Sequence, residues 1–515
     1  MDCLMGIDLG STSLKAVVYD LDGNALAAGS CPTQPFHPAA EHPEWTVWQP
    51  EQIWGGIAGA IREALAKLAG RGTIRAVAVT GMGMDGLPVD ERGAPLYPLI
   101  SWHDPRTQPQ HRWWLENIGA EKVFAIGGNP LWPINSALRM KWIAENEPEI
   151  YRRAAKWLLI EDFVNFRLCG RQVTDFSMAS CTALFDQRTL AWSDELVRLS
   201  GLDRRLLCEI QPSGTPIGEV GAAAAGATGL PPGTPVVLGG HDHLCGGLPV
   251  GAFCPGSVLN VTGTWEMVMT PTVGPVLQDS LRATGMTVQA HVARGLHAIW
   301  GGNVAGAMLH WWVEQLSHAR QADKAPDDGA DWNRLMAEAA AAPAGARGVM
   351  FLPHMAAAAC PVVDPRSLGG LVGLSTRATR GDIVRSVMEG LSYQVLDMVA
   401  AIEAILGTKL EQLVSVGGST RNVFWTQIKA DVAGRPVHVP AVEEATSLGA
   451  AVLAGIGMGF YRDEQEAFER VGRSGRTYEP DPTNARRYAG GFEIYRSLHP
   501  SIQSVSHSIF QEFMT

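Results

Sequence analysis

Apolar runs that end at glycine and hydroxyl residues recur along this chain, and they predict strands that lead into polar turns. The first run, 4–9, breaks at Gly10 and three hydroxyl residues before a second apolar run begins at Leu14. The same pattern returns about 250 residues later, where the predicted strand 256–261 leads into a turn at 262–264. Two strand–turn–strand units at this distance predict two related domains that face one ligand.

Helical and strand-like periodicities alternate between and after these two units, which is typical of an α/β protein. We expect helices over 51–69, most of 110–200, 381–406, 423–432 and 446–456, and from about 484 onward, with 316–346 as an Ala-rich surface excursion. We expect further strands over 74–80, 96–102, 235–238 and 413–416, each of which runs into a turn.

Length and charge narrow the possible functions. A chain of 515 residues exceeds the size at which one hydrophobic core stops growing, so two or more domains are expected. The net charge of -11 argues against a nucleic-acid or membrane-surface partner, but not against ATP, because local N–H groups and magnesium hold its phosphates. Eight scattered cysteines without CxxC spacing indicate buried thiols in a reducing compartment. With no apolar run long enough to span a bilayer, we expect a cytoplasmic protein.

The turn after the first apolar run carries groups that suit a nucleotide. A glycine there lets the backbone approach an anion, and successive N–H groups and hydroxyls can face phosphate oxygens. Asp8 ends the strand where it can hold a hydrated magnesium ion. An ordinary hairpin whose polar turn faces water is the competing interpretation. The candidate phosphate-binding residues are Gly10, Ser11, Thr12, Ser13 and Lys15.

A carboxylate follows the apolar strand 235–238, within the sequence Gly-Gly-His-Asp-His. Ligands of α/β proteins bind at the C-terminal ends of strands, where Asp242 can accept a proton from a substrate hydroxyl. His241 and His243 flank this aspartate and suggest a metal site as the alternative. No third ligand lies close in sequence, which favours the general base.

Two further turns complete the candidate nucleotide site. The second strand–turn unit offers hydroxyls and N–H groups at Thr262, Gly263 and Thr264, and its resemblance to the first turn gives it weight. After the strand 413–416, small residues precede a helix, so a flat ring can lie against the backbone and the helix N-terminus favours a phosphate oxygen. A simple helix N-cap is the competing interpretation of that turn. Its candidate residues are Gly417, Gly418, Ser419 and Asn422.

A set of polar and aromatic residues predicts a pocket for a polyhydroxylated co-substrate. Carboxylates and an amide can pair with hydroxyls, while an indole face covers C–H surface. The candidate residues are Met84, Asp85, Trp102, Asp104 and Asn135, together with Asp242. For the segment 104–106, a structural turn with a local salt bridge is the alternative.

In order and spacing, these motifs resemble the FGGY family of carbohydrate kinases from about residue 4 to about residue 500. The segments that carry the resemblance are 7–15, 240–242, 262–264, 370–374 with 382–390, 417–431 and 444–451. The resemblance implies two ribonuclease H-like α/β domains of the actin and hexokinase type, with a deep cleft between them. It places a sugar-binding domain at 1–247, an ATP-binding domain at 248–490 and a helical tail at 491–515.

The resemblance also implies roles for these residues in an ATP-dependent sugar kinase. Asp242 would be the general base, with Asp8 and Asp242 near the magnesium ion. The residues that would line the phosphates are Thr12, Thr262, Gly263 and Thr264, and those that would line the adenosine are Gly417, Gly418 and Asn422. Within the family, the segments 84–86, 100–102 and 105–107 look most similar to L-fuculose kinases, which favours a ketose such as L-fuculose or xylulose.

Departures from the family pattern keep the substrate open. Asp104 is more like glycerol and xylulose kinases, whereas Ile134 stands where glycerol kinases have a substrate-contacting tyrosine, so glycerol is disfavoured. A related polyol remains an alternative acceptor. An actin- or heat-shock-like ATPase without a sugar pocket, or a regulatory protein that binds sugar without catalysis, are the alternatives from other classes. A homodimer is compatible with the sequence, which does not fix the oligomeric state.

Overall fold

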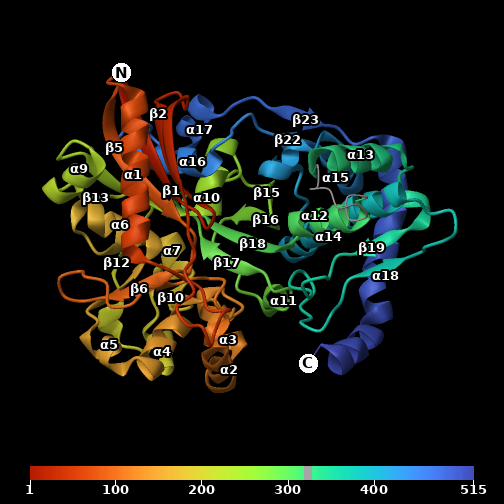
Figure 1. The fold of residues 1–515 in the computed structure, drawn as a ribbon, viewed down its shortest axis with the longest axis horizontal. Coiled ribbons are helices and arrows are strands. Elements are labelled where there is room, and N and C mark those ends of the chain that lie inside the picture. The colour runs from red at the N-terminus through yellow and green to blue at the C-terminus, as the bar shows by residue number, and fades with distance from the viewer. Residues whose placement is uncertain (318–327, 515) are drawn as a thin grey trace.

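The computed structural model describes residues 1–317 and 328–514, which form two α/β lobes (Figure 1). The first lobe is built on a six-stranded sheet and the second on a seven-stranded sheet. In spatial order, the first sheet contains β13 (Pro216–Glu219), β14 (Pro235–His241), β5 (Thr73–Gly81), β1 (Asp2–Leu9), β2 (Ser13–Asp20) and β3 (Ala25–Pro32). The second contains β17 (Thr287–Ala290), β18 (His297–Val304), β16 (Trp265–Thr272), β15 (Ser257–Thr262), β21 (Gln412–Val416), β22 (Val437–Val439) and β23 (Arg476–Tyr478).

The two sheets repeat one strand arrangement. In the first lobe β1, β2 and β3 form an antiparallel meander, and β1, β5 and β14 run parallel. In the second lobe β15, β16 and β18 form the meander, and β15, β21 and β22 run parallel. The predicted internal repeat is therefore confirmed, and with it the pair of actin- and hexokinase-like domains.

Helices and small sheets surround the first sheet. The helices are α1 (Pro50–Leu68), α2 (Gln108–Asn117), α3 (Ala120–Gly127), α4 (Ser136–Asn146), α5 (Pro148–Arg153), α6 (Ile160–Cys169), α7 (Phe176–Ser180), α8 (Asp194–Ser200), α9 (Ala222–Thr228) and α10 (Asp242–Gly247). The smaller strands are β4 (Val47–Trp48), β6 (Gly86–Val89), β7 (Leu99–Ile100), β8 (Lys156–Leu159), β9 (Val173–Asp175), β10 (Phe185–Asp186), β11 (Ala191–Trp192) and β12 (Glu209–Gln211). The expectation of a mainly helical 110–200 holds only in part, because β8 to β11 interrupt it.

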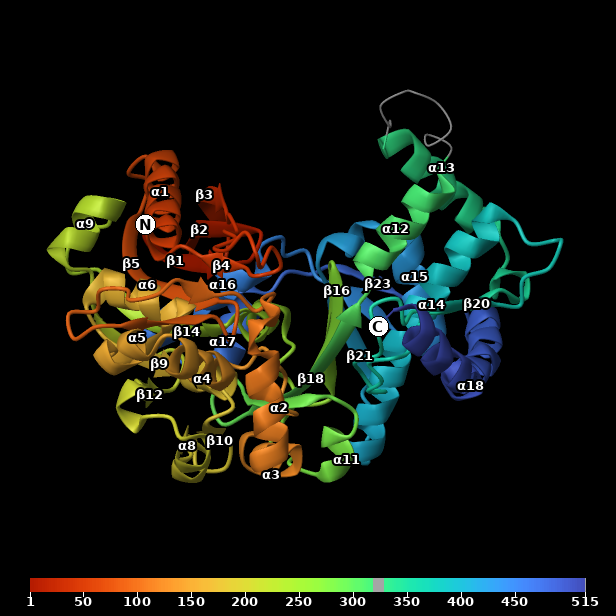
Figure 2. The same cartoon turned by 60° about the horizontal axis from the view of Figure 1, so that its bottom comes forward.

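The second lobe places its helices beside its sheet and at its outer end (Figure 2). They are α11 (Asp279–Arg282), α12 (Gly306–Leu316), α13 (Asp328–Ala341), α14 (Arg380–Leu406), α15 (Val423–Ala433) and α18 (Pro482–Phe513), with the short strands β19 (Met350–Leu352) and β20 (Gly370–Val372). Helix α16 (Ala445–Gly457) and helix α17 (Glu464–Val471), which packs on it, come from the same half of the chain but lie at the first lobe. The helices expected at 381–406, 423–432, 446–456 and from 484 are confirmed. Part of the expected excursion 316–346 lies outside the described residues, and its remainder contains α13.

Helix α16 belongs to the second half of the sequence, but it packs on the sheet of the first lobe, against β1, β5 and β14. Gly6 of β1 makes this approach possible, because a Cβ there would lie 1.7 Å from the carbonyl oxygen of Ser447. The first lobe is thus completed by a late segment of the chain. None of the helices in the described ranges combines the length and the apolarity needed to cross a membrane.

Candidate active site

A cavity of about 450 Å³ lies where the two lobes meet. Its wall consists mostly of indole, thioether and other apolar groups. Two edge-to-face indole pairs cross the boundary between the lobes, Trp102 with Trp265 at 6.4 Å and Trp132 with Trp300 at 5.4 Å between ring centres. The lining residues are Ser11, Met82, Gly83, Met84, Trp102, Trp132, Ile134, His241, Asp242 and His243 from the first lobe and Trp265, Met267, Trp300 and Gly302 from the second.

Asp242 enters this cavity directly after β14 as the first residue of α10. Its Oδ1 accepts a hydrogen bond from the backbone N–H of His243 at 2.6 Å, and Nδ1 of the same histidine lies 2.7 Å away. Burial alone would raise the pKa of Asp242, but the charge and hydrogen bonds of His243, helped by His241, lower it to about 2. Asp242 is therefore a carboxylate at neutral pH.

Asp8 ends β1 at the same edge of the sheet, because β1 and β14 both run parallel to the intervening β5. Removal from water and the charge of Asp242 raise the pKa of Asp8 to about 7, Lys15 lowers it, and Glu444 adds a smaller increase. Two carboxylates that repel one another at one site suit a divalent cation, which takes oxygen ligands. Asp8 and Asp242 are thus the residues that fit magnesium.

The three consecutive residues His241, Asp242 and His243 also place their ligand atoms within 4.8 Å of one another. The histidine nitrogens are partly engaged, however. Nδ1 of His243 bonds Asp242, and Nδ1 of His241 lies within hydrogen-bonding distance of the Gln289 amide. The geometry therefore supports a hydrogen-bonded carboxylate better than a histidine-bound metal.

The first turn is closed by a hydrogen bond from Gly10 N–H to the Ser13 carbonyl at 3.2 Å. Ser11 lines the cavity, whereas Thr12 is exposed and its carbonyl accepts from the backbone of Thr33. The Lys15 ammonium pairs with Glu444 at 2.9 Å. Of the predicted phosphate-binding residues of this turn, only Ser11 lines the cavity.

The second turn, between β15 and β16, exposes Gly263 and Thr264 but buries Thr262. The Thr262 hydroxyl donates to Glu266 at 2.8 Å and accepts from the ammonium of Lys429 at 2.5 Å, and Lys429 also pairs with Glu266. This side chain therefore faces the interior, and only the backbone of Thr262 borders the turn. A buried ion pair behind the turn was not foreseen; the lysine within the apolar helix 423–432 was the available signal.

A second cavity, of about 660 Å³, lies within the second lobe beside this turn. Gly417 (φ 103°) lies against the backbone of Thr262, and a Cβ on Gly417 would be 2.4 Å from the Thr262 carbonyl oxygen. Asn422 caps α15 by accepting from the Trp425 N–H, and Ser419 donates to the Thr262 carbonyl. The lining residues include Gly263, Thr264, Gly306, His310, Trp332, Met336, Gly418, Ser419, Arg421 and Asn422. The turns at 262–264 and 417–422 thus meet at one cavity large enough for a nucleoside.

The residues predicted to bind the co-substrate divide into two groups. Met84 and Trp102 line the interlobe cavity, whereas Asp85, Asp104 and Asn135 are buried outside its lining. Asp104 accepts from the guanidinium of Arg106 through both carboxylate oxygens and from the backbone of Thr46. The structural turn with a local salt bridge is thus what the structure shows at 104–106.

The other two buried polar residues also have protein partners. Asn135 accepts from the Trp132 N–H and donates to the Cys181 carbonyl. Asp85 accepts from the indole of Trp48 at 2.6 Å, and burial raises its pKa to about 7 despite the nearby Arg139. These residues shape the loops that carry the cavity wall.

Sequence comparison agrees with this arrangement of two lobes. The N-terminal domain of the FGGY family of carbohydrate kinases matches residues 3–248, and its C-terminal domain matches residues 258–458. The chain belongs to the FGGY family of carbohydrate kinases. It is therefore an ATP-dependent sugar phosphotransferase.

Known FGGY kinases are similar over nearly the whole chain. The L-fuculokinase of Escherichia coli K12 is 30% identical over 93% of this chain and 97% of its own length. The autoinducer-2 kinase of Yersinia pseudotuberculosis serotype O:3 is 30% identical over 97% of this chain and 94% of its own length. The crystal structure of the xylulose kinase from Rhodospirillum rubrum has a TM-score of 0.88 and 28% identity, covering 98% of this chain and all of that chain.

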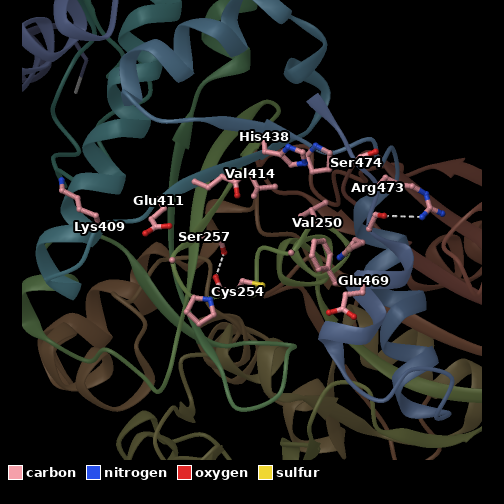
Figure 3. Close-up of a pocket in the computed structure, with 18 of the residues that line it drawn as sticks. Val250, Cys254, Ser257, Lys409, Glu411, Val414, His438, Glu469, Arg473 and Ser474 are labelled. Atoms are coloured by element: carbon pink, nitrogen blue, oxygen red, sulfur yellow. Dashed lines mark hydrogen bonds between the residues drawn. The ribbon is translucent and has the colours of Figure 1, made fainter. Parts of the chain in front are cut away.

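This FGGY kinase has a further cavity, of about 880 Å³, at the N-terminal ends of β15 and β21 (Figure 3). Ser257 and Gln412, which begin β15 and β21, line it together with Phe468 and Glu469 of α17. The turns at 262–264 and 417–422 follow the opposite ends of these strands. None of the predicted site residues lines this third cavity.

Three tryptophans of the interlobe cavity, Trp132, Trp265 and Trp300, were missed as site residues. Trp265 directly follows the second phosphate turn, and Trp132 lies in the same loop as Asn135, so both had a positional signal. Trp300 lies on β18 and comes from the other lobe. Only the tertiary arrangement brings it to Asp242.

Proposed function

We propose that this FGGY kinase transfers the γ-phosphate of ATP to a hydroxyl of a ketose such as L-fuculose or xylulose, with Asp242 as the general base. The position of Asp242 carries this proposal. Its carboxylate lies in the wall of a cavity that both lobes line, and its pKa of about 2 keeps it ionised at neutral pH. An ionised carboxylate can take the proton of an attacking hydroxyl.

The nucleotide would lie along the second lobe, with its base in the 660 Å³ cavity and its phosphates over the turns at 10–13 and 262–264. Backbone N–H groups of these turns would bind phosphate oxygens. Asp8 and Asp242 would hold magnesium, which neutralises phosphate charge when ATP is bound. The indole pairs between the lobes exclude water, which would otherwise compete with the sugar as acceptor.

The wall of the interlobe cavity supports L-fuculose over a fully hydroxylated acceptor. Indole and methionine side chains dominate this wall, and they pack well against C–H and methyl groups. L-fuculose carries a methyl group at one end of its carbon chain, whereas xylulose, the shorter ketose, carries a hydroxymethyl group there. A related polyol would leave more hydroxyls facing apolar side chains.

The test is ADP release in the presence of magnesium and a panel of acceptors: L-fuculose, xylulose, autoinducer-2, glycerol and no acceptor. We expect ADP formation that depends on a ketose and exceeds the rate without acceptor. Mass spectrometry of the product would show one added phosphoryl group on the sugar. ATP hydrolysis at the same rate with and without every acceptor would contradict the proposal and favour an actin-like ATPase.

A further inference from the structure

Another cavity, of about 500 Å³, lies at the outer end of the second lobe, between α14, α18 and β19 (Figure 1). Its volume is within the range of small-molecule sites. Among the described residues, it shares no lining side chain with the interlobe cavity or with the cavities of 660 and 880 Å³. We propose that this cavity is a separate ligand site for an amphipathic monocarboxylate, whose carboxylate meets Arg487 and Tyr393 while its apolar body lies inside.

The hydroxyl of Tyr393 is a buried donor at this cavity. Tyr393 belongs to α14, lines the cavity and is only 4% exposed. Its hydroxyl oxygen lies against α18, where a Cβ on Gly491 would be 2.2 Å away from it. The described residues offer this hydroxyl no hydrogen-bond partner. Burial raises the pKa of Tyr393, so the hydroxyl keeps its proton at neutral pH and needs an acceptor, which a ligand in the cavity would supply.

Arg487 of α18 supplies the second donor. It lines the cavity, and its Nε would lie 3.1 Å from a Cβ on Gly345. Its positive charge opposes the rise in the pKa of Tyr393 that burial causes, which places it near that hydroxyl. Arg487 and Gly491 lie one helical turn apart, on the same face of α18. No carboxylate or other acceptor in the described ranges pairs with this guanidinium, so its charge is uncompensated at the cavity.

Glu389, which brings the one carboxylate in the described lining, already has its partners. Its Oε1 accepts hydrogen bonds from Arg385 Nε at 2.7 Å, from the Tyr488 hydroxyl at 2.6 Å and from the Gly345 N–H at 2.9 Å. Because Arg385 cancels the charge of Glu389, Arg487 leaves the cavity with one unpaired positive charge. A single charge matches a carboxylate better than a phosphate, which carries about two negative charges at neutral pH.

The rest of the wall is apolar and defines the other half of the ligand. Glycines leave the space free, since a Cβ on Gly348 or Gly490 would meet no atom within 4 Å. An alkyl or aryl group gains stability when such a wall removes it from water, whereas the hydroxyls of a sugar would lose their hydrogen bonds there. The apolar lining side chains are Val349, Met350, Phe351, Val372, Ile494 and Leu498.

The experiment is a calorimetric titration of the full chain with octanoate, with octanamide as its uncharged analogue. Arg487→Met removes the guanidinium but keeps an apolar stem, and Tyr393→Phe removes only the hydroxyl. Arg486→Met is the matched control, because Arg486 is the exposed neighbour of Arg487 on the same helix and does not line the cavity. Octyl phosphate separates a preference for phosphate from one for carboxylate.

We expect saturable binding of octanoate to the wild type. Arg487→Met should weaken it by about tenfold to a hundredfold, the effect of one lost hydrogen bond to a charged group. Tyr393→Phe should weaken it by about twofold to tenfold, and Arg486→Met should stay within about twofold of wild type. Octanamide should bind the wild type about as weakly as octanoate binds Arg487→Met.

Three results would overturn the inference: no saturable binding of octanoate to the wild type, equal affinities of the wild type and Arg487→Met, or an equal loss of affinity in Arg486→Met. Tighter binding of octyl phosphate than of octanoate would overturn the assignment of a carboxylate. If Tyr393→Phe is too unstable to titrate, Arg487→Met decides alone, because Arg487 is exposed. The readout is octanoate affinity and not ADP release, so the result is independent of the proposed kinase reaction.

Discussion

The ammonium of Lys15 lies 2.9 Å from the carboxylate of Glu444, although 429 positions separate the two residues. Lys15 belongs to β2 in the hairpin of β1 and β2, and Glu444 directly precedes α16. The pair therefore joins this hairpin to the late helix that completes the first lobe. It also sets the charge beside Asp8, whose pKa Lys15 lowers and Glu444 raises.

Lys15→Met should affect nucleotide binding more than stability. Both partners of the ion pair are partly exposed, so its loss should cost at most about 1 kcal/mol in the free energy of unfolding. The loss of a positive charge near the phosphates should raise the KM for ATP. Urea unfolding and steady-state kinetics measure the two effects, and a KM for ATP equal to that of wild type would contradict the role of Lys15.

Asp242→Asn should bind ATP and sugar but turn over slowly. Removing a general base typically lowers kcat by about a hundredfold to ten-thousandfold. Calorimetric titration with ATP and with the sugar would check that binding persists. Asp194→Asn is the control, because Asp194 is 89% exposed on α8 and far in sequence from the site. A kcat near that of wild type would rule out Asp242 as the base.

Asp8→Asn should stabilise the ligand-free protein at high pH. Burial raises the pKa of Asp8 to about 7, so folding loses stability as the pH rises from the unfolded pKa of about 4 to about 7, where the carboxyl must ionise in the folded state. Asparagine has no carboxyl group to ionise, so the variant does not lose this stability. We expect a Tm above that of wild type at pH 8, and little difference near pH 4.

The same substitution should weaken magnesium-dependent activity, which separates stability from function. Thermal unfolding across this pH range, followed by a magnesium titration of the kinase rate, measures both. A Tm difference that does not change with pH would show that Asp8 is not desolvated as described.

Lys429→Met should destabilise the second lobe and disturb the second phosphate turn. Its ammonium lies in the interior with Glu266, Thr262 and Asn260 as partners. Removing one partner of a buried ion pair leaves the other charge uncompensated, which costs about 3 to 5 kcal/mol. Urea unfolding should show this loss, and the double variant with Glu266→Gln should recover part of it. If the two single effects simply add, the two residues are not coupled.

Asp364→Asn should loosen the C-terminal helix α18. Asp364 is 6% exposed and accepts hydrogen bonds from His499, Gln503 and His507 of that helix at 3.0, 3.2 and 2.8 Å. Burial alone would raise the pKa of Asp364, but these hydrogen bonds hold it below its usual range. The variant should lose about 2 kcal/mol in the stability of the helix contact, a value typical of hydrogen bonds to a charged group.

This contribution depends on pH with a definite sign. Because the folded pKa is depressed, the stability is present above the unfolded pKa of about 4 and is lost as the pH falls through the folded pKa. Amide hydrogen exchange along α18 at pH 7, compared between the Asp364→Asn variant and wild type, measures the effect of the substitution. Equal exchange rates in variant and wild type would show that the three hydrogen bonds do not hold the helix.

The strands and the turns after them could be predicted because both signals are local. Apolar runs ending at Gly10, Thr262 and Gly417 mark strand ends, and parallel strands bring such ends to one edge. Asp104 and Asn135 show where this reasoning stops. Residue type does not reveal whether a polar side chain faces a cavity or is satisfied by Arg106 or a neighbouring carbonyl. Trp300 could not be predicted for another reason: it lies on β18 of the second lobe, and only the packing of the two lobes brings it to the cavity.

The close contact between Gly6 and Ser447 has a consequence for how the protein is made. When a ribosome has synthesised only the first 247 residues, the sheet that carries Asp8 lacks α16, and the apolar side chains that this helix covers, among them Leu4, Ala78 and Val237, remain bare. Such a surface attracts chaperones or other nascent chains. We therefore expect an excised fragment 1–247 to aggregate unless residues 445–457 are supplied in trans.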